Sequence, residues 1–168
     1  MSGGVNLVIR ALIEGYVSAV EGVVPNNGNV YFDQDIPFLT GNGVNQADTV
    51  YSQALALGPS GTETLDLLTG LTDALGMPVA LARCKAIIVV VGAAGGSVTL
   101  AGGASNPFLG PLGGTTPTVT TNPGGLTALV APDATAWAVA SGTANLKLTN
   151  NSSTLGATGT IYILGASS

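Results

Sequence analysis

From Ala86 to Pro132 the chain carries no aspartate, glutamate, lysine or arginine, and this uncharged stretch restricts its fold more than any other feature. Glycine and proline interrupt it repeatedly, so it never reaches the roughly 18 consecutive apolar residues of a membrane helix. What remains are short apolar and threonine-rich segments between turn residues, the pattern of an all-β protein. Their spacing, roughly 8 to 12 residues, predicts a β-sandwich or jelly roll.

The composition of the whole chain of 168 residues agrees with this pattern. Charged residues make up 8%, whereas a soluble domain usually has roughly 25%. A disordered chain would be highly charged and poor in aliphatic residues, which this one is not. The length allows one domain with a core and a short additional segment. We therefore predict a single, jelly-roll-like β-sandwich over residues 40–168, preceded by an N-terminal arm or extra elements over residues 1–39.

The few charges exclude several partners and compartments. Net charge is −5, and the basic residues are Arg10, Arg83, Lys85 and Lys147. These are too few to replace the counterions of nucleic acid, so we expect no DNA or RNA partner. Residues 1–4 lack the basic segment of a signal peptide, and no membrane association is expected. The one cysteine cannot form an intramolecular disulfide, which fits folding in a reducing cytosol.

The uncharged stretch also bears on assembly, because a low surface charge limits the solubility of a monomer. One interpretation is that neighbouring subunits cover much of this surface. The alternative is a face solvated by threonine, serine, asparagine and backbone groups. We favour subunit contact and keep the alternative open.

Turn residues divide the first half of the chain into candidate strands. Val5–Val20 fits a helical face and a strand face equally well, with a slight preference for strand from its β-branched residues. Asn26–Asn29 is a strong turn signal. Thr49–Leu57 and Thr62–Leu68 alternate around Gly58–Gly61 and are expected to pair as a hairpin. A helical turn is possible within Asp66–Leu75.

The second half contains the most apolar strand and a regular series after it. Ala86–Val91 is apolar at every position, so we expect a central strand buried on both faces. It belongs to the longer segment Val79–Val91. Further strands are expected at Ser97–Leu100, Thr118–Thr121, Leu126–Val130, Ala136–Ala140, Asn145–Thr149 and Thr160–Leu164.

Two motifs resemble catalytic or cofactor sites at first sight. Cys84 lies between two cations that would lower its pKa, but its place at the entry to a core strand favours a small buried residue without reactivity. Gly92–Gly96 follows a strand as a dinucleotide-binding loop would. That loop requires a helix immediately afterwards, whereas Ser97–Leu100 alternates as a strand, so the glycines are expected to form a hairpin turn.

The remaining polar residues do not form a recognisable site. The chain has no histidine, which excludes Ser-His-Asp and Cys-His catalysis. Asp33 and Asp35 offer oxygens for Ca²⁺, but no ligand series continues from them. The glutamates, Glu14, Glu21 and Glu63, lack an aromatic sugar-binding context. We predict a protein that is not an enzyme, with no catalytic, metal-binding or cofactor-binding residue and no cofactor.

Two further motifs have simple explanations. Trp137, the only tryptophan, lies in an alternating segment and is expected to anchor the core. Asn150–Ser153 contains two overlapping glycosylation sequons, which matter only in a secreted eukaryotic protein.

Several turn-and-strand segments, in their order along the chain, are similar to segments of small β-sandwich virion proteins of tailed bacteriophages. The resemblance covers roughly residues 40–166. The matching segments are Gly41–Tyr51, Thr62–Leu67, Leu71–Gly76, Ala82–Ile88, Gly102–Phe108, Gly113–Gly114, Pro123–Leu126, Ala131–Pro132, Asn145–Asn150 and Ile161–Gly165.

This resemblance implies a place on a phage particle and no catalytic residue. The leading hypothesis is a head decoration or cement protein that stabilises the capsid by binding between capsid subunits. Its expected partners are the major capsid protein and copies of itself, as a trimer, and its location is the virion, assembled in the host bacterial cytoplasm. Residues 1–39 would be an arm that reaches a neighbouring subunit. The alternatives are a structural protein of a tail, neck or fibre, and a carbohydrate-binding β-sandwich module.

Overall fold

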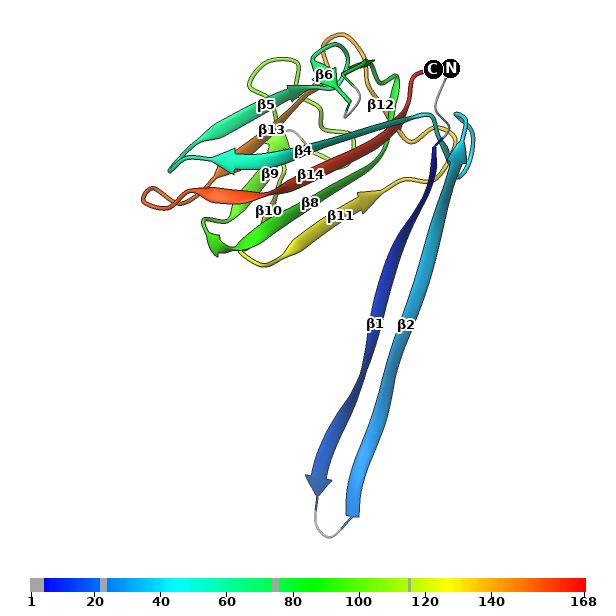
Figure 1. Cartoon of the computed structure of the whole chain (residues 1–168), viewed down its shortest axis with the longest axis vertical. Coiled ribbons are helices and arrows are strands. Elements are labelled where there is room, and N and C mark those ends of the chain that lie inside the picture. The colour runs from blue at the N-terminus through cyan, green and yellow to red at the C-terminus, as the bar shows by residue number, and fades with distance from the viewer. Residues whose placement is uncertain (1–4, 22–23, 74–75, 115) are drawn as a thin grey trace.

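A computed structural model of the chain describes residues 5–21, 24–73, 76–114 and 116–168. Strands are the only regular elements in these ranges, and no helix is found in them. The strands form a β-sandwich and a long two-stranded arm that leaves one end of it (Figure 1). The predicted all-β class is therefore confirmed.

The arm is an antiparallel hairpin of β1 (Asn6–Glu21) and β2 (Val24–Thr40). The segment that fitted helix and strand equally is thus a strand. The turn predicted at Asn26–Asn29 is wrong, because these residues lie inside β2 and pair with residues 16–19. Apolar pairs nearer the sandwich, such as Leu7–Phe38, fix this register, since a slip of one residue would move their side chains to the other face.

Two antiparallel sheets make up the sandwich. The first, here called the β8 sheet, has the order β11-β8-β14-β4, with β12 paired to the start of β8. The second, the β9 sheet, has the order β10-β9-β13-β5. Their strands are β4 (Thr49–Leu57), β5 (Thr62–Asp66), β8 (Arg83–Gly95), β9 (Val98–Gly102), β10 (Thr118–Thr121), β11 (Leu126–Val130), β12 (Trp137–Ala138), β13 (Asn145–Asn150) and β14 (Ala157–Ala166).

Three very short strands complete the fold. The arm continues into β3 (Gln46–Ala47), which pairs in parallel with the end of β2. A small ribbon is formed by β6 (Leu71–Thr72) and β7 (Pro78–Val79). The helical turn considered within Asp66–Leu75 is reduced to one turn, closed by a hydrogen bond from the Gly70 amide to the Asp66 carbonyl; residues 74 and 75 lie outside the described residues.

Most connections cross from one sheet to the other, which corrects two predicted hairpins. β4 pairs with β14 and β5 pairs with β13, so the turn at Gly58–Gly61 joins strands of opposite sheets. Gly92–Gly95 lie at the end of β8, and residues 96 and 97 lead from there into β9 of the other sheet, so these glycines do not form a hairpin turn within one sheet. The physical reason is that the apolar faces of successive strands meet across the core instead of lying side by side. This crossing order is compatible with the predicted jelly roll.

The main core lies between the two sheets. It includes inward-facing, fully buried side chains of both, among them Ile87, Val89, Ile161 and Ile163 from the β8 sheet, and Val98, Leu100, Leu146 and Leu148 from the β9 sheet. Leu67, Leu81 and Phe108 close its ends. Trp137, the expected anchor, is half-buried and packs against this core from β12.

β8 is central in its sheet, as expected, but it is not buried on both faces. Ile87, Val89 and Val91 face the core, whereas Ile88 is half-buried and Val90 is 36% exposed. The expectation of two-sided burial is therefore wrong for this chain. A continuous apolar run is compatible with an open outer face, because sequence periodicity reports side-chain polarity and not what covers a face.

Asn150 is a buried polar residue that connects two of the loops between the sheets. Its Nδ2 donates to the carbonyls of Gly58 and Leu155, both at 2.8 Å, and its Oδ1 accepts from the Ser152 amide at 3.0 Å. One side chain thereby joins the β4–β5 turn to the β13–β14 loop.

We predict that Asn150→Ala lowers the free energy of unfolding by about 1–3 kcal/mol, because the hydrogen bonds of this buried side chain to the carbonyls of Gly58 and Leu155 and to the Ser152 amide are lost. The matched control is Asn151→Ala, whose exposed side chain bonds Ser97 and Thr99 and should cost less than about 1 kcal/mol. Urea denaturation of both variants measures the difference. Equal losses would contradict the assigned role of Asn150.

Candidate interaction surface

The arm carries large apolar side chains that the described part of the chain leaves exposed. Paired residues of a hairpin share a face, so Leu7, Ile9, Ala11 and Ile13 lie on the same face as their partners Phe38, Ile36, Gln34 and Phe32. We call this set the apolar arm face. Ile13 is 59% exposed and Phe32 is 47% exposed, which is unusual for apolar side chains on a long strand.

The opposite face of the arm carries its charges. Arg10 bonds Asp33 through Nε at 3.0 Å and through Nη2 at 2.5 Å, and Asp35 lies 3.5 Å from Nε. The Tyr31 hydroxyl donates to Asp33 at 3.2 Å. Because this cluster is exposed, solvent screens its ion pairs and they contribute little to the stability of the fold. Asp33 and Asp35, considered above as calcium ligands, are thus occupied with Arg10.

The root of the arm packs on the outer face of the β8 sheet. Phe38 is fully buried there against Ala47, Ala86 and Leu164. The surrounding, partly buried residues of this second cluster are Val5, Ile9, Ile36, Val50 and Val130. The apolar arm face therefore contacts the sheet at the root through Phe38, Ile9 and Ile36, whereas Leu7 at the root and Ile13 and Phe32 farther along the arm remain exposed.

Lys85 fixes the loop at the arm root. Its residue is fully buried, and its Nζ donates to the carbonyls of Gly43, at 3.1 Å, and Asp133. Lys85 occupies the irregularity in the β8–β14 ladder, where pairing shifts between Leu164 and Gly165. Burial lowers the pKa of Lys85, nearby Arg83 lowers it further, and Asp133 opposes the shift. The ammonium group thus joins the arm-root loop to the segment after β11.

Arg83 and backbone bonds extend the same junction. The Arg83 guanidinium donates to the carbonyl of Ala134 at 2.7 Å and to the main-chain oxygen of Ser168. The Asn45 amide donates to the Pro132 carbonyl at 2.7 Å. Two of the chain's four cations therefore hold backbone segments at the arm root.

Asp48 holds the end of β14 beside the root. Its carboxylate accepts from the Ser167 amide at 2.8 Å, the Ser167 hydroxyl at 2.7 Å and the Thr49 hydroxyl at 2.8 Å. Partial burial alone would raise the pKa of Asp48, but these hydrogen bonds outweigh it and leave the pKa below its ordinary value of 3.8. The charged form of Asp48 is therefore the one that stabilises the fold.

The other residues singled out in the sequence are scattered. Cys84 is fully buried, and burial raises the pKa of its thiol well above the ordinary value. Glu14 is exposed on the arm, Glu21 ends β1, and Glu63 accepts a hydrogen bond from Gln53 at 2.5 Å. Asn150, the first residue of the sequon pair, is buried. The structure brings none of these described residues together as a site.

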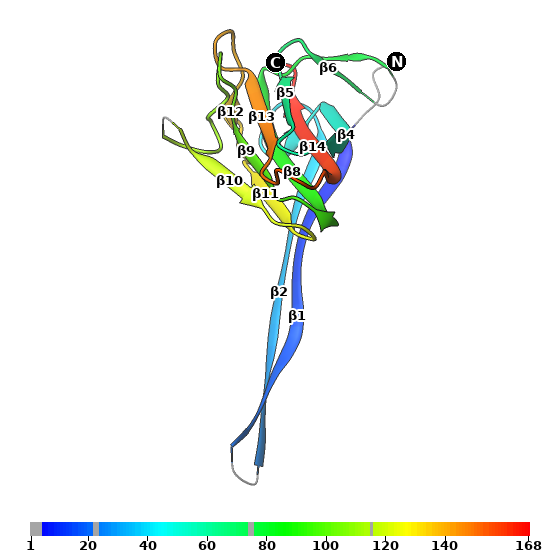
Figure 2. The same ribbon diagram turned by 90° about the vertical axis from the view of Figure 1, so that its left-hand side faces the viewer.

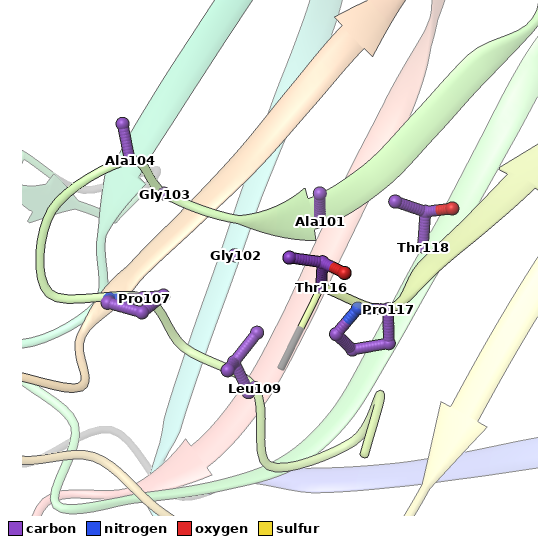
Figure 3. Close-up of a pocket in the computed structure, with 9 residues that line it drawn as sticks. All are labelled: Ala101, Gly102, Gly103, Ala104, Pro107, Leu109, Thr116, Pro117 and Thr118. Carbon is purple, nitrogen blue, oxygen red and sulfur yellow. The ribbon is translucent and has the colours of Figure 1, made fainter. Parts of the chain in front are cut away.

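The β9 sheet has a pocket of about 350 Å³ at its β9–β10 side (Figure 3). Small apolar residues, prolines and threonines line it: Ala101, Gly102, Gly103, Ala104, Pro107, Leu109, Thr116, Pro117 and Thr118. A ligand site usually combines apolar walls with a few convergent charged or polar groups. None of the described residues that line this pocket is charged, so the arm is the stronger candidate for binding.

A search of protein-family models finds no match to this chain, and a comparison with curated proteins finds none either. Within the described residues, no helix has the length and apolar character needed to cross a membrane. The interpretation of the surface therefore rests on its physical chemistry.

We predict that Lys85→Met lowers the free energy of unfolding by about 1–3 kcal/mol, because two partly buried hydrogen bonds to the carbonyls of Gly43 and Asp133 are lost. Hydrogen exchange at the Asn45 amide should accelerate about tenfold or more, since the arm-root loop is released. Lys147→Met, on the other sheet, is the control and should leave exchange at Asn45 unchanged. Unchanged exchange in Lys85→Met would contradict the role of Lys85 at the root.

We predict that the stability difference between the wild type and Asp48→Asn depends on pH. A depressed pKa stabilises the fold above the ordinary value of 3.8, and this contribution is lost as the pH falls through the lower value in the folded state. Thermal unfolding from about pH 7 to about pH 3 should show the difference shrinking toward the acid end. A constant difference would show that Asp48 acts without its charge.

Proposed function

We propose that this protein is a structural subunit of a tailed-phage virion that decorates the head by binding between capsid subunits. The observation that carries the proposal is the arm, a hairpin from Asn6 to Thr40 with exposed apolar side chains projecting from a separately packed sandwich. A lone two-stranded hairpin is marginally stable in water. An arm of this length and polarity is therefore suited to an assembled state in which a neighbour covers it.

The stiffness of the root supports a role in assembly. Phe38, Lys85 and the Asn45–Pro132 hydrogen bond hold the arm at a defined place on the sandwich. A binding segment that is already placed loses less conformational freedom on association than a disordered one. The arm can therefore bind a fixed position on a repeated lattice, and binding only the assembled state stabilises that state.

The shortage of charge supports contact through apolar groups and strand edges. Outside the junction residues Arg83 and Lys85, the cations are Arg10, paired on the arm, and Lys147. Affinity in a shell then comes from many weak apolar contacts repeated by symmetry. A tail, neck or fibre subunit would bind through the same kind of apolar contacts. The location of the protein on the particle distinguishes that alternative from a head decoration protein.

We predict that the protein is found in the head fraction of disrupted virions, in hundreds of copies per particle, as symmetry requires of a head decoration. Quantitative mass spectrometry of separated heads and tails, with the major capsid protein as the internal standard, measures this. Recovery in tail fractions alone would overturn the head assignment.

We also predict that proteinase K removes the arm from the free protein and not from the assembled particle. Exposed, marginally stable strands open locally and are cleaved, whereas covered strands are protected. Mass spectrometry of the fragments identifies the cleavage sites. Equal cleavage of the arm in both states would show that the arm is not a contact in the particle.

A further inference from the structure

The outer face of the β8 sheet is a second uncovered apolar surface. The register of its four strands places residues in rows across the sheet. The row next to the arm root is Val130, Ala86, Leu164 and Val50; the second is Ala128, Ile88, Tyr162 and Ser52; the third is Leu126, Val90, Thr160 and Ala54. None of these residues is charged.

Only the first row is covered in the isolated chain. It packs beneath Phe38, Ile9 and Ile36 of the apolar arm face. In the outer rows Leu126 is 62% exposed and Tyr162 is 40% exposed. The exposed outer rows are thus continuous with the first row, which the apolar face of the arm covers. This continuity indicates that the missing partner is an apolar surface like that of the arm.

The arm of the same molecule cannot supply that partner. Beyond its root the arm runs away from the sandwich in both views (Figures 1 and 2), and Ile13 and Phe32 remain exposed. Its departure is fixed by buried Phe38 and by Lys85 bonded to Gly43. One molecule therefore presents two uncovered apolar surfaces that it cannot bring together.

We propose that the outer rows of the β8 sheet are the docking site for the distal arm of a second copy of this chain. The arm of one copy places Ile13 and Phe32 over Leu126, Val90 and Tyr162 of the next. The contact extends, between molecules, the apolar packing that the arm root makes within one. It rests on the proposed function only in taking the arm as a binding segment.

The contact joins the arm of one copy to the β8 sheet of another. Each copy can therefore dock its own arm on a neighbour and bind a neighbour's arm on its sheet. Such contacts close into dimers by exchange or into rings, according to the rotation between copies. The face that bears Arg10, Asp33 and Asp35 stays outside the contact, where its charges remain hydrated. Burial of charge is thereby avoided.

Sedimentation of the full-length protein at about 100 µM, far above a micromolar dissociation constant, tests the proposal. The wild type should be an oligomer. Phe32→Asp and Leu126→Asp should each weaken association about tenfold or more, because each places a charge in the apolar contact. Leu155→Asp is the matched control, since Leu155 is 57% exposed on the β13–β14 loop, and it should associate as the wild type does.

Mixing Phe32→Asp with Leu126→Asp distinguishes docking of an arm on a sheet from arm-to-arm or sheet-to-sheet contact. A Leu126→Asp copy still has an intact arm and a Phe32→Asp copy an intact sheet face, so the mixture should associate more strongly than either variant alone. Loss of association in only one of the two variants would indicate arm-to-arm or sheet-to-sheet contact and overturn the proposal. A wild-type monomer, or a mixture no stronger than its components, would overturn it too.

Unfolding must be excluded as the cause of any loss. Both positions are exposed, so the thermal midpoints of the variants should stay close to that of the wild type; Phe32→Ser and Leu126→Ser replace any variant that does not fold. These measurements use the isolated protein, whereas the virion assignment is tested on particles. Failure of one is therefore distinguishable from failure of the other.

Discussion

The buried ammonium group of Lys85 is the interaction on which the relation between the arm and the sandwich depends. A charge removed from water is costly unless hydrogen bonds replace its hydration. Lys85 meets this requirement with the carbonyls of Gly43 and Asp133, one from each side of the junction. If either segment moved away, a buried charge would lose a partner. The penalty for breaking the junction is therefore larger than the net contribution of an ordinary hydrogen bond.

The same junction divides the molecule into parts with different sources of stability. The sandwich is stabilised by side chains buried between its sheets, such as Ile87 and Leu148. Beyond Phe38, the stabilising contacts found in the described part of the arm are a backbone ladder, a few cross-strand pairs and the exposed Arg10–Asp33 pair. Local opening should therefore cost less in the arm than in the sandwich. The arm can therefore change conformation locally while its root stays packed on the sandwich.

Much of the sandwich could be predicted from sequence, because strand identity is a local property. Thr49–Leu57, Thr118–Thr121 and Leu126–Val130 were bounded by turn residues and are found with those limits. Which strands pair is not local, so β4 and β5 were wrongly paired with each other, and the arm was given a turn at Asn26–Asn29. The polarity of a strand also does not reveal whether its outer face is covered, as Val90 shows.

The candidate surface could be predicted only in part from the sequence. The lack of charge from Ala86 to Pro132 pointed to contact between subunits but not to a particular face. Lys85 looked in the sequence like a flanking cation of Cys84, and nothing local indicated that its amine reaches Gly43, far away along the chain. The alternation of Leu7, Ile9, Ala11 and Ile13 would have indicated the apolar arm face, once the segment was taken as a strand.

The arm also has a property that depends on its backbone alone. Among the described strands, none pairs with the outer edge of β1, and β2 is paired at its outer edge at Leu39 and Thr40, with β3. Most outward amide and carbonyl groups along both edges therefore face solvent, and such edges accept additional strands. In the unassembled protein, these open edges could pair with other chains and start aggregation. The exposed charges of Arg10, Glu14, Asp33 and Asp35 oppose this aggregation. Their effect accounts for the presence of these charges on the arm of a protein that otherwise has few.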